Sequence, residues 1–319
     1  MRFTAIMAAT MMAASLAWGQ TNTTPPQGSS AATPAAKAQT TGNGQAAPAT
    51  GSSRVLQAKS QEELKAYQDA FAKTEAASME AAADDFAAKY PNSELTPSLY
   101  VRVMNLYSQT NNTEKVIATG EKAIAGDPTN PIPLVQVASA IAETTRDTDL
   151  DREQQLALAA KDAHAAIDNI DTGLIVPANA DPQRVAGAKR SILTMAYDTL
   201  GMIDLNKKDY PSAAKNLQKA IELSQSNPEA VLYLRLSVAQ DHMEQYPQAL
   251  DSANKAVQYS KDGTPAQNLA KQQQARVQKL MSAGSSTPAA GAPAATPSPV
   301  PTTTTPGQSP APTSPNVPH

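Results

Sequence analysis

Histidines and closely spaced aspartates are the side chains of this sequence best suited to metal binding or acid–base chemistry. The three histidines, His164, His242 and His319, lie far apart in the chain. Aspartates alternate from Asp147 to Asp151 as in a calcium-binding loop, but this stretch lacks the glycine of the sixth loop position and the glutamate of the twelfth. We therefore predict a solvated turn at the aspartates and no metal site.

Other patterns that carry chemistry are missing from the sequence. It contains no cysteine, which excludes a disulfide framework, a thiolate zinc site and a cysteine nucleophile. It has neither a glycine-rich phosphate loop nor the motif that presents a nucleophilic serine. The net charge of −3 comes without a basic run, whereas a phosphate backbone needs clustered lysine and arginine. We expect no catalytic site, no cofactor and no nucleic-acid partner.

The first nineteen residues have the three parts of a secretory signal peptide. Arg2 precedes an uncharged apolar stretch that ends near Ala17, and Gly19 fits a cleavage site. This stretch is too short to span a bilayer, which takes about 20 apolar residues. Residues 1–19 therefore predict export to the periplasm or the extracellular space, with no membrane span after their removal. A buried first helix is the alternative.

Nearly all charged residues lie in the middle of the chain. Residues 20–54 and 283–319 hold 14 of the 25 prolines but only two charged side chains. Such segments bury too little apolar surface to offset the entropy of ordering them. We predict one folded domain at residues 55–282, a disordered linker at 20–54 and a disordered tail at 283–319. Within the tail, residues 296–301 favour an extended polyproline II conformation.

A short motif recurs in the predicted domain. Lys122, Lys219 and Lys255 each begin a Lys-Ala-Ile or Lys-Ala-Val tripeptide. Two longer matches begin with the Tyr-Pro steps at Tyr210 and Tyr246, which lie 36 residues apart. Proline suits the first turn of a helix, where its missing N–H is no loss. A period of this size indicates an array of paired helices.

One repeat unit is defined by large and small residues at fixed spacing, namely Tyr197, Leu200, Gly201, Ala213, Leu217 and Ala220. At these positions the chain resembles the tetratricopeptide repeat (TPR) family, whose unit of about 34 residues pairs two antiparallel helices. A second copy contains Tyr233, and a third contains Tyr100 with larger residues at two small positions. The resemblance implies an all-α fold, a right-handed superhelical array of antiparallel helix pairs (a TPR-like α-solenoid).

Less regular units complete the predicted array. Residues 61–90 are expected to form a first helix pair, and residues 132–144 and 153–170 another. Residues 168–182 are the least repeat-like part of the domain and are expected to form a loop at one edge. A helix at 265–281, apolar on one side and polar on the other, would end the array in a soluble form.

The resemblance also implies where a partner binds. In the TPR family the first helix of each unit lines a concave groove, and a fixed set of its positions points inward. Carried over to the units of Tyr197 and Tyr233, these positions hold mostly apolar residues with polar residues at the ends. The candidate partner groove consists of Met195, Asp198, Met202, Leu205, Asn206, Val231, Leu234, Val238, Asp241 and His242.

Two interpretations of this groove stay open. An exposed apolar strip with adaptable methionines suits an amphipathic helix or an extended apolar peptide. Alternatively, the terminal helix at 265–281 or close stacking of neighbouring units covers it, because apolar residues at helical spacing are more often core than site. The Lys/Asn/Arg set with which similar chaperone-binding units hold a carboxylate is not present.

These features predict an exported, non-catalytic scaffold that holds a protein or peptide partner in the cell envelope. The alternative is a secreted or periplasmic binder of peptidoglycan or another envelope polymer, acting through the helical groove or the Pro/Thr tail. An enzyme is a third interpretation, disfavoured because the sequence offers no set of nucleophile, base and orienting group.

Overall fold

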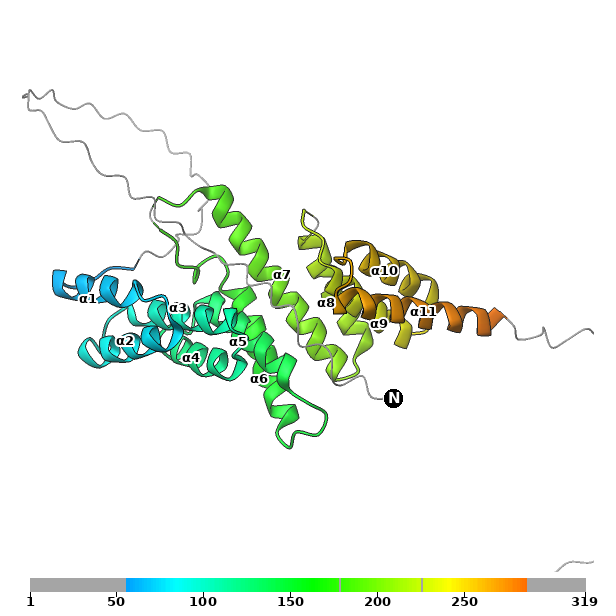
Figure 1. Cartoon of the computed structure of the whole chain (residues 1–319), viewed down its shortest axis with the longest axis horizontal. Coiled ribbons are helices and arrows are strands. Elements are labelled where there is room, and N and C mark those ends of the chain that lie inside the picture. The colour runs from blue at the N-terminus through cyan, green and yellow to red at the C-terminus, as the bar shows by residue number, and fades with distance from the viewer. Residues whose placement is uncertain (1–55, 178, 225, 286–319) are drawn as a thin grey trace, which may run out of the picture.

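The computed structural model describes residues 56–177, 179–224 and 226–285. These residues form eleven α-helices and no β-strand, and the helices are stacked along one long axis (Figure 1). In this part of the chain, no helix has the length and apolar character needed to cross a membrane. The helices are α1 Gln61–Phe71, α2 Ala76–Lys89, α3 Thr96–Gln109, α4 Thr113–Gly126, α5 Pro131–Thr144, α6 Arg152–Asp168, α7 Pro182–Asn206, α8 Tyr210–Leu223, α9 Ala230–His242, α10 Tyr246–Tyr259 and α11 Pro265–Ser285.

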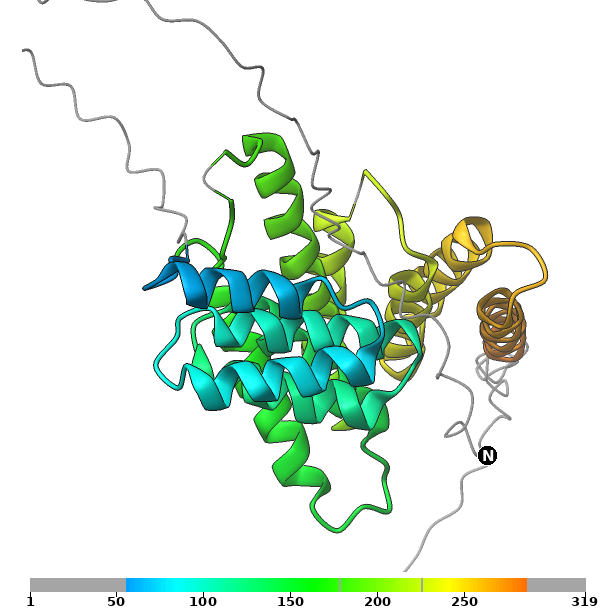
Figure 2. The same cartoon turned by 60° about the vertical axis from the view of Figure 1, so that its left-hand side comes forward.

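Consecutive helices pack as pairs. The most extensive contacts join α3 with α4, α5 with α6, α7 with α8 and α9 with α10, and the first helices α5 and α7 also touch each other. The last helix, α11, packs on α10 and α9, and Figure 2 shows it end-on beside α10. The prediction of an all-α array of helix pairs is confirmed, and the chain is a TPR-like α-solenoid.

The turn between the two helices of a pair has the same backbone in three repeats. Asn111, Lys208 and Glu244 have positive φ angles of 54°, 62° and 59°. In each turn the next amide donates to the carbonyl five residues earlier, at 2.9–3.1 Å. Helices often end in this left-handed conformation, usually with glycine. Its recurrence without glycine shows that the geometry belongs to the repeat.

Short polar side chains and prolines start the second helices. Asn112 accepts a backbone N–H of α4 and Asp209 accepts one of α8, both at 3.2 Å. Pro211 and Pro247 occupy the first turns of α8 and α10. These side chains satisfy or remove amides that have no partner within the helix, so the Tyr-Pro steps of the sequence mark true helix starts.

A large and a small residue face each other inside the pairs. A Cβ at Gly201 of α7 would lie 2.6 Å from Cγ of Leu217 in α8. In the α3/α4 pair the order is reversed, because an added Cβ at Gly120 of α4 would lie 3.0 Å from Sδ of Met104 in α3. The same Cβ would lie even closer to Cγ2 of Val137 in α5, so Gly120 also admits the next pair. In the Tyr100 unit the large residue thus lies on the first helix and the glycine on the second, the reverse of the Tyr197 unit. The two helices can still approach closely.

Three segments differ in detail from the sequence prediction. Helix α7 has 25 residues and begins at Pro182, well before the recognised repeat pattern. Residues 169–177 and 179–181, within the predicted loop at 168–182, are non-helical, but Leu174 and Val176 are buried in the core because they are apolar. Helix α11 continues to Ser285, past the predicted domain boundary at 282.

The predicted signal peptide at 1–19 and the predicted linker at 20–54 lie outside the described residues. The predicted tail also lies outside them from residue 286 onward. Export, spacer and tail assignments therefore stay predictions from the sequence.

Candidate functional site

The α7 part of the candidate groove lies in the middle of the array. Met202 is buried in the largest core cluster, and Met195 is half-buried against the cluster that contains Leu134 and Ile192. Leu205 is half-buried against the core shared by α8 and α9. The two methionines thus fill space between helices, whereas Leu205 keeps part of its surface accessible.

The α9 part of the groove is divided between α11 and solvent. Leu234 is 5% exposed and belongs to a cluster with Ala256 of α10 and Ala270 of α11. For Leu234 the structure agrees with the interpretation in which the terminal helix covers the groove. Val231 and Val238 are half-buried, so this part of α9 still presents apolar surface.

The polar residues at the end of α9 have partners within the fold. The buried carboxylate of Asp241 accepts hydrogen bonds from Gln273 Nε2 at 3.2 Å and Arg276 Nε at 2.6 Å, both on α11. His242 is exposed and stacks on the ring of Tyr210, with ring centres 4.3 Å apart. Asp241 therefore fixes α11 to α9, and only His242 faces solvent.

Asn206 joins three helices at the end of α7. Its Nδ2 donates to the carbonyl of Ala142 in α5 at 3.2 Å. Its own backbone carbonyl accepts a hydrogen bond from Arg152 at the start of α6. Asn206 thus stabilises the contact between neighbouring pairs, and its side-chain amide is already engaged by the fold.

A charged cluster connects α5, α7 and α9. The guanidinium of Arg235, whose side chain is 7% exposed, forms an ion pair with Asp198. Glu143 near the end of α5 and Glu229 just before α9 also interact with this guanidinium through their charge. We call these four residues the acidic cluster, since three carboxylates surround one cation.

Desolvation is the largest influence on the pKa of Glu143, Glu229 and Arg235 in the acidic cluster. Although Glu143 and Glu229 retain contact with solvent, desolvation raises the pKa of both carboxyls. Burial alone would lower the pKa of Arg235, but Asp198 and the two glutamates raise it overall. Arg235 therefore keeps its charge.

Sequence reasoning placed Asp198 in the groove but missed Arg235 and the two glutamates. Arg235 does not occupy an inward-facing position of the TPR pattern, and the unit that contains Glu143 was too irregular to align. The available signal was an arginine within the apolar run at residues 231–236. Since buried arginine is rare without a partner, this residue could have indicated a nearby carboxylate.

The recurring lysine of the sequence motif meets the recurring tyrosine. Lys122 Nζ lies 5.1 Å from the ring centre of Tyr100 and 2.7 Å from Asp84 of the preceding pair. Lys255 lies over Tyr233 in the same way, at 6.0 Å. Tyrosine and lysine are thus kept at the same spacing because they pack together between the two helices of a pair.

A second set of contacts closes the surface between α2, α3 and α4. Tyr107 donates to Glu80 at 2.6 Å, and Lys115 pairs with the same carboxylate at 3.0 Å. This hydrogen bond to Glu80, together with burial, raises the pKa of Tyr107 to about 12. We call this surface the α2–α4 seam; it is lined by Glu80, Asp84, Tyr107 and Lys115.

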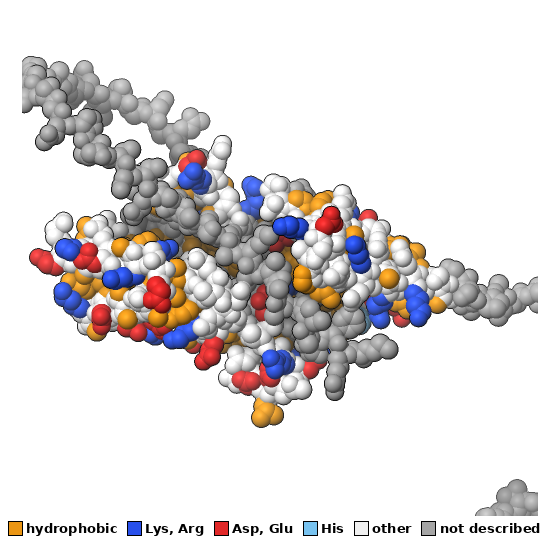
Figure 3. Space-filling model, viewed as in Figure 1, with side chains coloured by type: hydrophobic (Ala, Val, Ile, Leu, Met, Phe, Trp, Pro, Cys, Tyr) orange, Lys and Arg blue, Asp and Glu red, His pale blue; other side chains and the backbone are white. Residues whose placement is uncertain are grey.

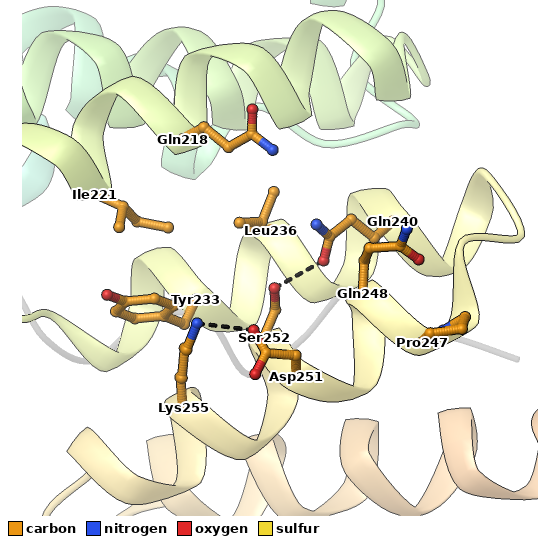
Figure 4. A pocket seen from close by; sticks show the side chains of 10 residues that line it. All are labelled: Gln218, Ile221, Tyr233, Leu236, Gln240, Pro247, Gln248, Asp251, Ser252 and Lys255. Carbon is orange, nitrogen blue, oxygen red and sulfur yellow. Dashed lines mark hydrogen bonds and ion pairs between the residues drawn. The ribbon is translucent and has the colours of Figure 1, made fainter.

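The equivalent surface between α8, α9 and α10, the α8–α10 seam, is open (Figure 4). The positions that correspond to the lining residues of the α2–α4 seam carry no charge here. Asp84, Tyr107 and Lys115 are replaced by Gln218, Gln240 and Gln248 in that order, and Glu80 is replaced by Ala214. A pocket of about 560 Å³ results, with Tyr233 and other apolar side chains between the amides. The α8–α10 seam thus carries a pocket at the position where charged contacts join α2, α3 and α4 in the α2–α4 seam. A separate pocket of about 390 Å³ lies beside Tyr107, between the start of α2 and the end of α3.

Charges of both signs are interspersed over the face of the array seen in Figure 3, without a large patch of one sign. The described part of the chain holds no group of three or more histidines and carboxylates that could bind a metal ion.

Comparisons with known proteins give a structural likeness only. No family model matches this sequence, and no curated protein matches it. Fourteen chains of solved structures match. One of them, described as the assembly chaperone of RpL4 (Acl4, residues 1–338), is 9% identical, with 70% of this chain and 99% of that chain covered at a TM-score of 0.38.

Proposed function

We propose that this protein is a non-catalytic helical-repeat scaffold whose concave surface holds a segment of a partner protein. The acidic cluster carries this proposal, because the exposed residues Glu143 and Glu229 form no ion pair with a lysine or arginine of their own among the described residues. Half-buried apolar side chains on the same helices, Leu205 of α7 and Val231 of α9, would form the apolar part of the surface. The partner segment would combine apolar residues with at least one lysine or arginine. Glu143 also lies at the negative end of α5, which further favours a cation.

The position of the cluster supports a binding role. Asp198 already uses one oxygen for Arg235, and its Oδ1 has no hydrogen-bond partner among the described residues. A cluster that served only to fix α9 to α7 would need one carboxylate for one guanidinium. Glu143 and Glu229 exceed this need, and opposite charge on a partner would steer association and fix its register.

The place of action in this proposal is the cell envelope. It is supported by the signal-peptide pattern at residues 1–19. Mass spectrometry of the protein recovered from its host is expected to show a mature N-terminus after Gly19. A mature protein that retains Phe3 would contradict export by this route.

The function is tested with a charge-removing pair of substitutions. Crosslinked partners of the full chain are identified in the host, and the affinity of the most abundant one is measured for the purified proteins. Glu143→Gln with Glu229→Gln is expected to weaken binding about tenfold and to reduce its salt dependence. Since the ion pair between Asp198 and Arg235 is kept in this variant, the fold should be unchanged by circular dichroism.

A matched control removes the same charge elsewhere. Glu114 and Glu121 are exposed on α4, and changing both to glutamine is expected to leave the affinity unchanged. Equal weakening by the two pairs would contradict a role for the acidic cluster. Retention of the protein by isolated wall material, without any protein partner, would instead favour a binder of envelope polymer.

A further inference from the structure

We propose that the α8–α10 seam binds the chain's own segment 296–301 as an extended polyproline II strand. This inference concerns a different surface from the concave one and is independent of the function proposed above. In α9 the mean direction of the seam residues and that of the candidate groove residues differ by well over a quarter turn at about 100° per residue. Both surfaces can therefore be occupied at once.

The seam offers hydrogen-bond donors without partners. Gln218 and Gln248 have exposed side chains and form no hydrogen bond with the described residues. Gln240 accepts from Ser252 at 2.7 Å through Oε1, which leaves its amino group available. All three amides line one pocket (Figure 4). A polyproline II strand makes no internal hydrogen bonds, so its carbonyls can accept from such donors.

The apolar side chains of the seam suit proline rings. The ring of Tyr233 lies along one side of the pocket, and Ile221, Leu236 and Pro247 complete its apolar lining (Figure 4). Proline-rich segments dock in grooves lined by aromatic residues because their conformation is already fixed and little entropy is lost. The sequence at 296–301 is Thr-Pro-Ser-Pro-Val-Pro, which alternates such rings with smaller residues.

The charge of the seam matches an uncharged ligand. Lys255 pairs with Asp251 at 2.7 Å, and these are the only charged residues that line the pocket. Residues 286–319 contain no lysine, arginine, aspartate or glutamate. The two surfaces are therefore compatible without an unpaired charge, whereas an acidic or basic peptide would find no partner for its charge here.

The tail also begins close to the seam. Helix α11 has 21 residues and α10 has 14, and the two run in opposite directions after a short turn. At a rise of about 1.5 Å per residue, α11 extends about 10 Å past the start of α10. Pro247 and Gln248 lie at this start. The residues between 286 and 296 would span about 30 Å at about 3.1 Å per residue, enough to bring segment 296–301 to the seam.

The experiment uses cysteine pairs in the full chain, which contains no native cysteine. One variant combines Gln218→Cys in the seam with Val300→Cys in the tail. The control combines Gln278→Cys on α11 with Val300→Cys; Gln278 is exposed and closer to the start of the tail. The rate of intramolecular disulfide formation is followed under mild oxidation, after circular dichroism has shown that both variants are folded.

If the tail is bound in the seam, the pair with Gln218→Cys is expected to form its disulfide at least ten times faster than the control pair. Changing Pro297, Pro299 and Pro301 to glycine leaves the helical array untouched and should remove this preference. A faster control pair, or a preference that survives the glycine changes, would overturn the proposal. Covalent dimers in place of intramolecular disulfides would also overturn it, since the tail would then come from a second copy.

Discussion

The Arg235 guanidinium is buried between α7 and α9, where removal from water costs several kcal/mol. Its ion pair with Asp198 compensates part of this cost, and the charges of Glu143 and Glu229 add to the compensation. However, Nε of Arg235 and Oδ1 of Asp198 have no hydrogen-bond partner among the described residues. The pair is therefore only partly satisfied, and it joins the neighbouring repeats that contain α7 and α9.

Removal of one member of this pair should be much worse than removal of both. Arg235→Met is expected to lower the free energy of unfolding by about 3 kcal/mol, because it leaves Asp198 desolvated and unpaired. Arg235→Met with Asp198→Leu should restore most of the loss. Urea unfolding followed by circular dichroism measures both. If the single variant is as stable as the wild type, the pair does not join α7 and α9 as described.

Tyr107 should make the fold sensitive to alkali. Its pKa of about 12 in the folded chain exceeds the ordinary tyrosine value of 10.0. As the pH rises between these two values, the unfolded chain loses the proton before the folded chain does, and the stability falls. Tyr107→Phe should remove this part of the pH dependence. Urea midpoints at about pH 9 and about pH 11 compare the two proteins; equal slopes would contradict the shifted pKa.

Each helix pair depends on complementary sizes at its closest approach. Gly201 faces Leu217 in one pair and Met104 faces Gly120 in another, so the small residue of a pair can lie on either helix. The turns at Asn111, Lys208 and Glu244 share a left-handed residue before the second helix begins. Close packing and turn geometry together define the repeat better than any single residue.

A double-mutant cycle tests this complementarity. Gly201→Ala is expected to lower the free energy of unfolding by about 1–3 kcal/mol, because the new Cβ meets the Leu217 side chain. In the background of Leu217→Ala the clash is relieved, and the same change should become neutral or stabilising by up to about 1 kcal/mol through helix propensity. Thermal or urea unfolding gives both values. Additive effects would show that the two residues do not meet.

The periodic features of the sequence predicted the helix pairs well. The Tyr-Pro steps, the Tyr197 and Tyr233 patterns and the polar terminal helix all correspond to observed elements, because they encode local packing and helix starts. The length of α7 was missed, since its first turns carry no repeat signature. The covering of Leu234 by α11 was one of the two interpretations that the sequence left open, and the choice between them depends on tertiary contacts such as the one between Arg276 and Asp241.

On the scale of the whole molecule, the array carries two kinds of surface on different faces. The first helices of the pairs carry the acidic cluster and the half-buried apolar residues on one side, while the α8–α10 seam opens on another face. The α2–α4 seam is closed by charged contacts, so the repeats at the two ends differ in what they can bind. This asymmetry is expected of a scaffold that engages a partner at one place along its length.

The most direct test of this account places a photo-crosslinking amino acid on each side of the array in the full chain. Position 238 on α9 lies on the proposed partner surface, and position 215 is exposed on α8. After irradiation in the host, a distinct protein partner should be crosslinked from position 238, not from position 215, and the yield should fall when Glu143 and Glu229 are changed to glutamine. Equal yields from both positions, or a yield unaffected by the glutamines, would contradict binding at the concave surface.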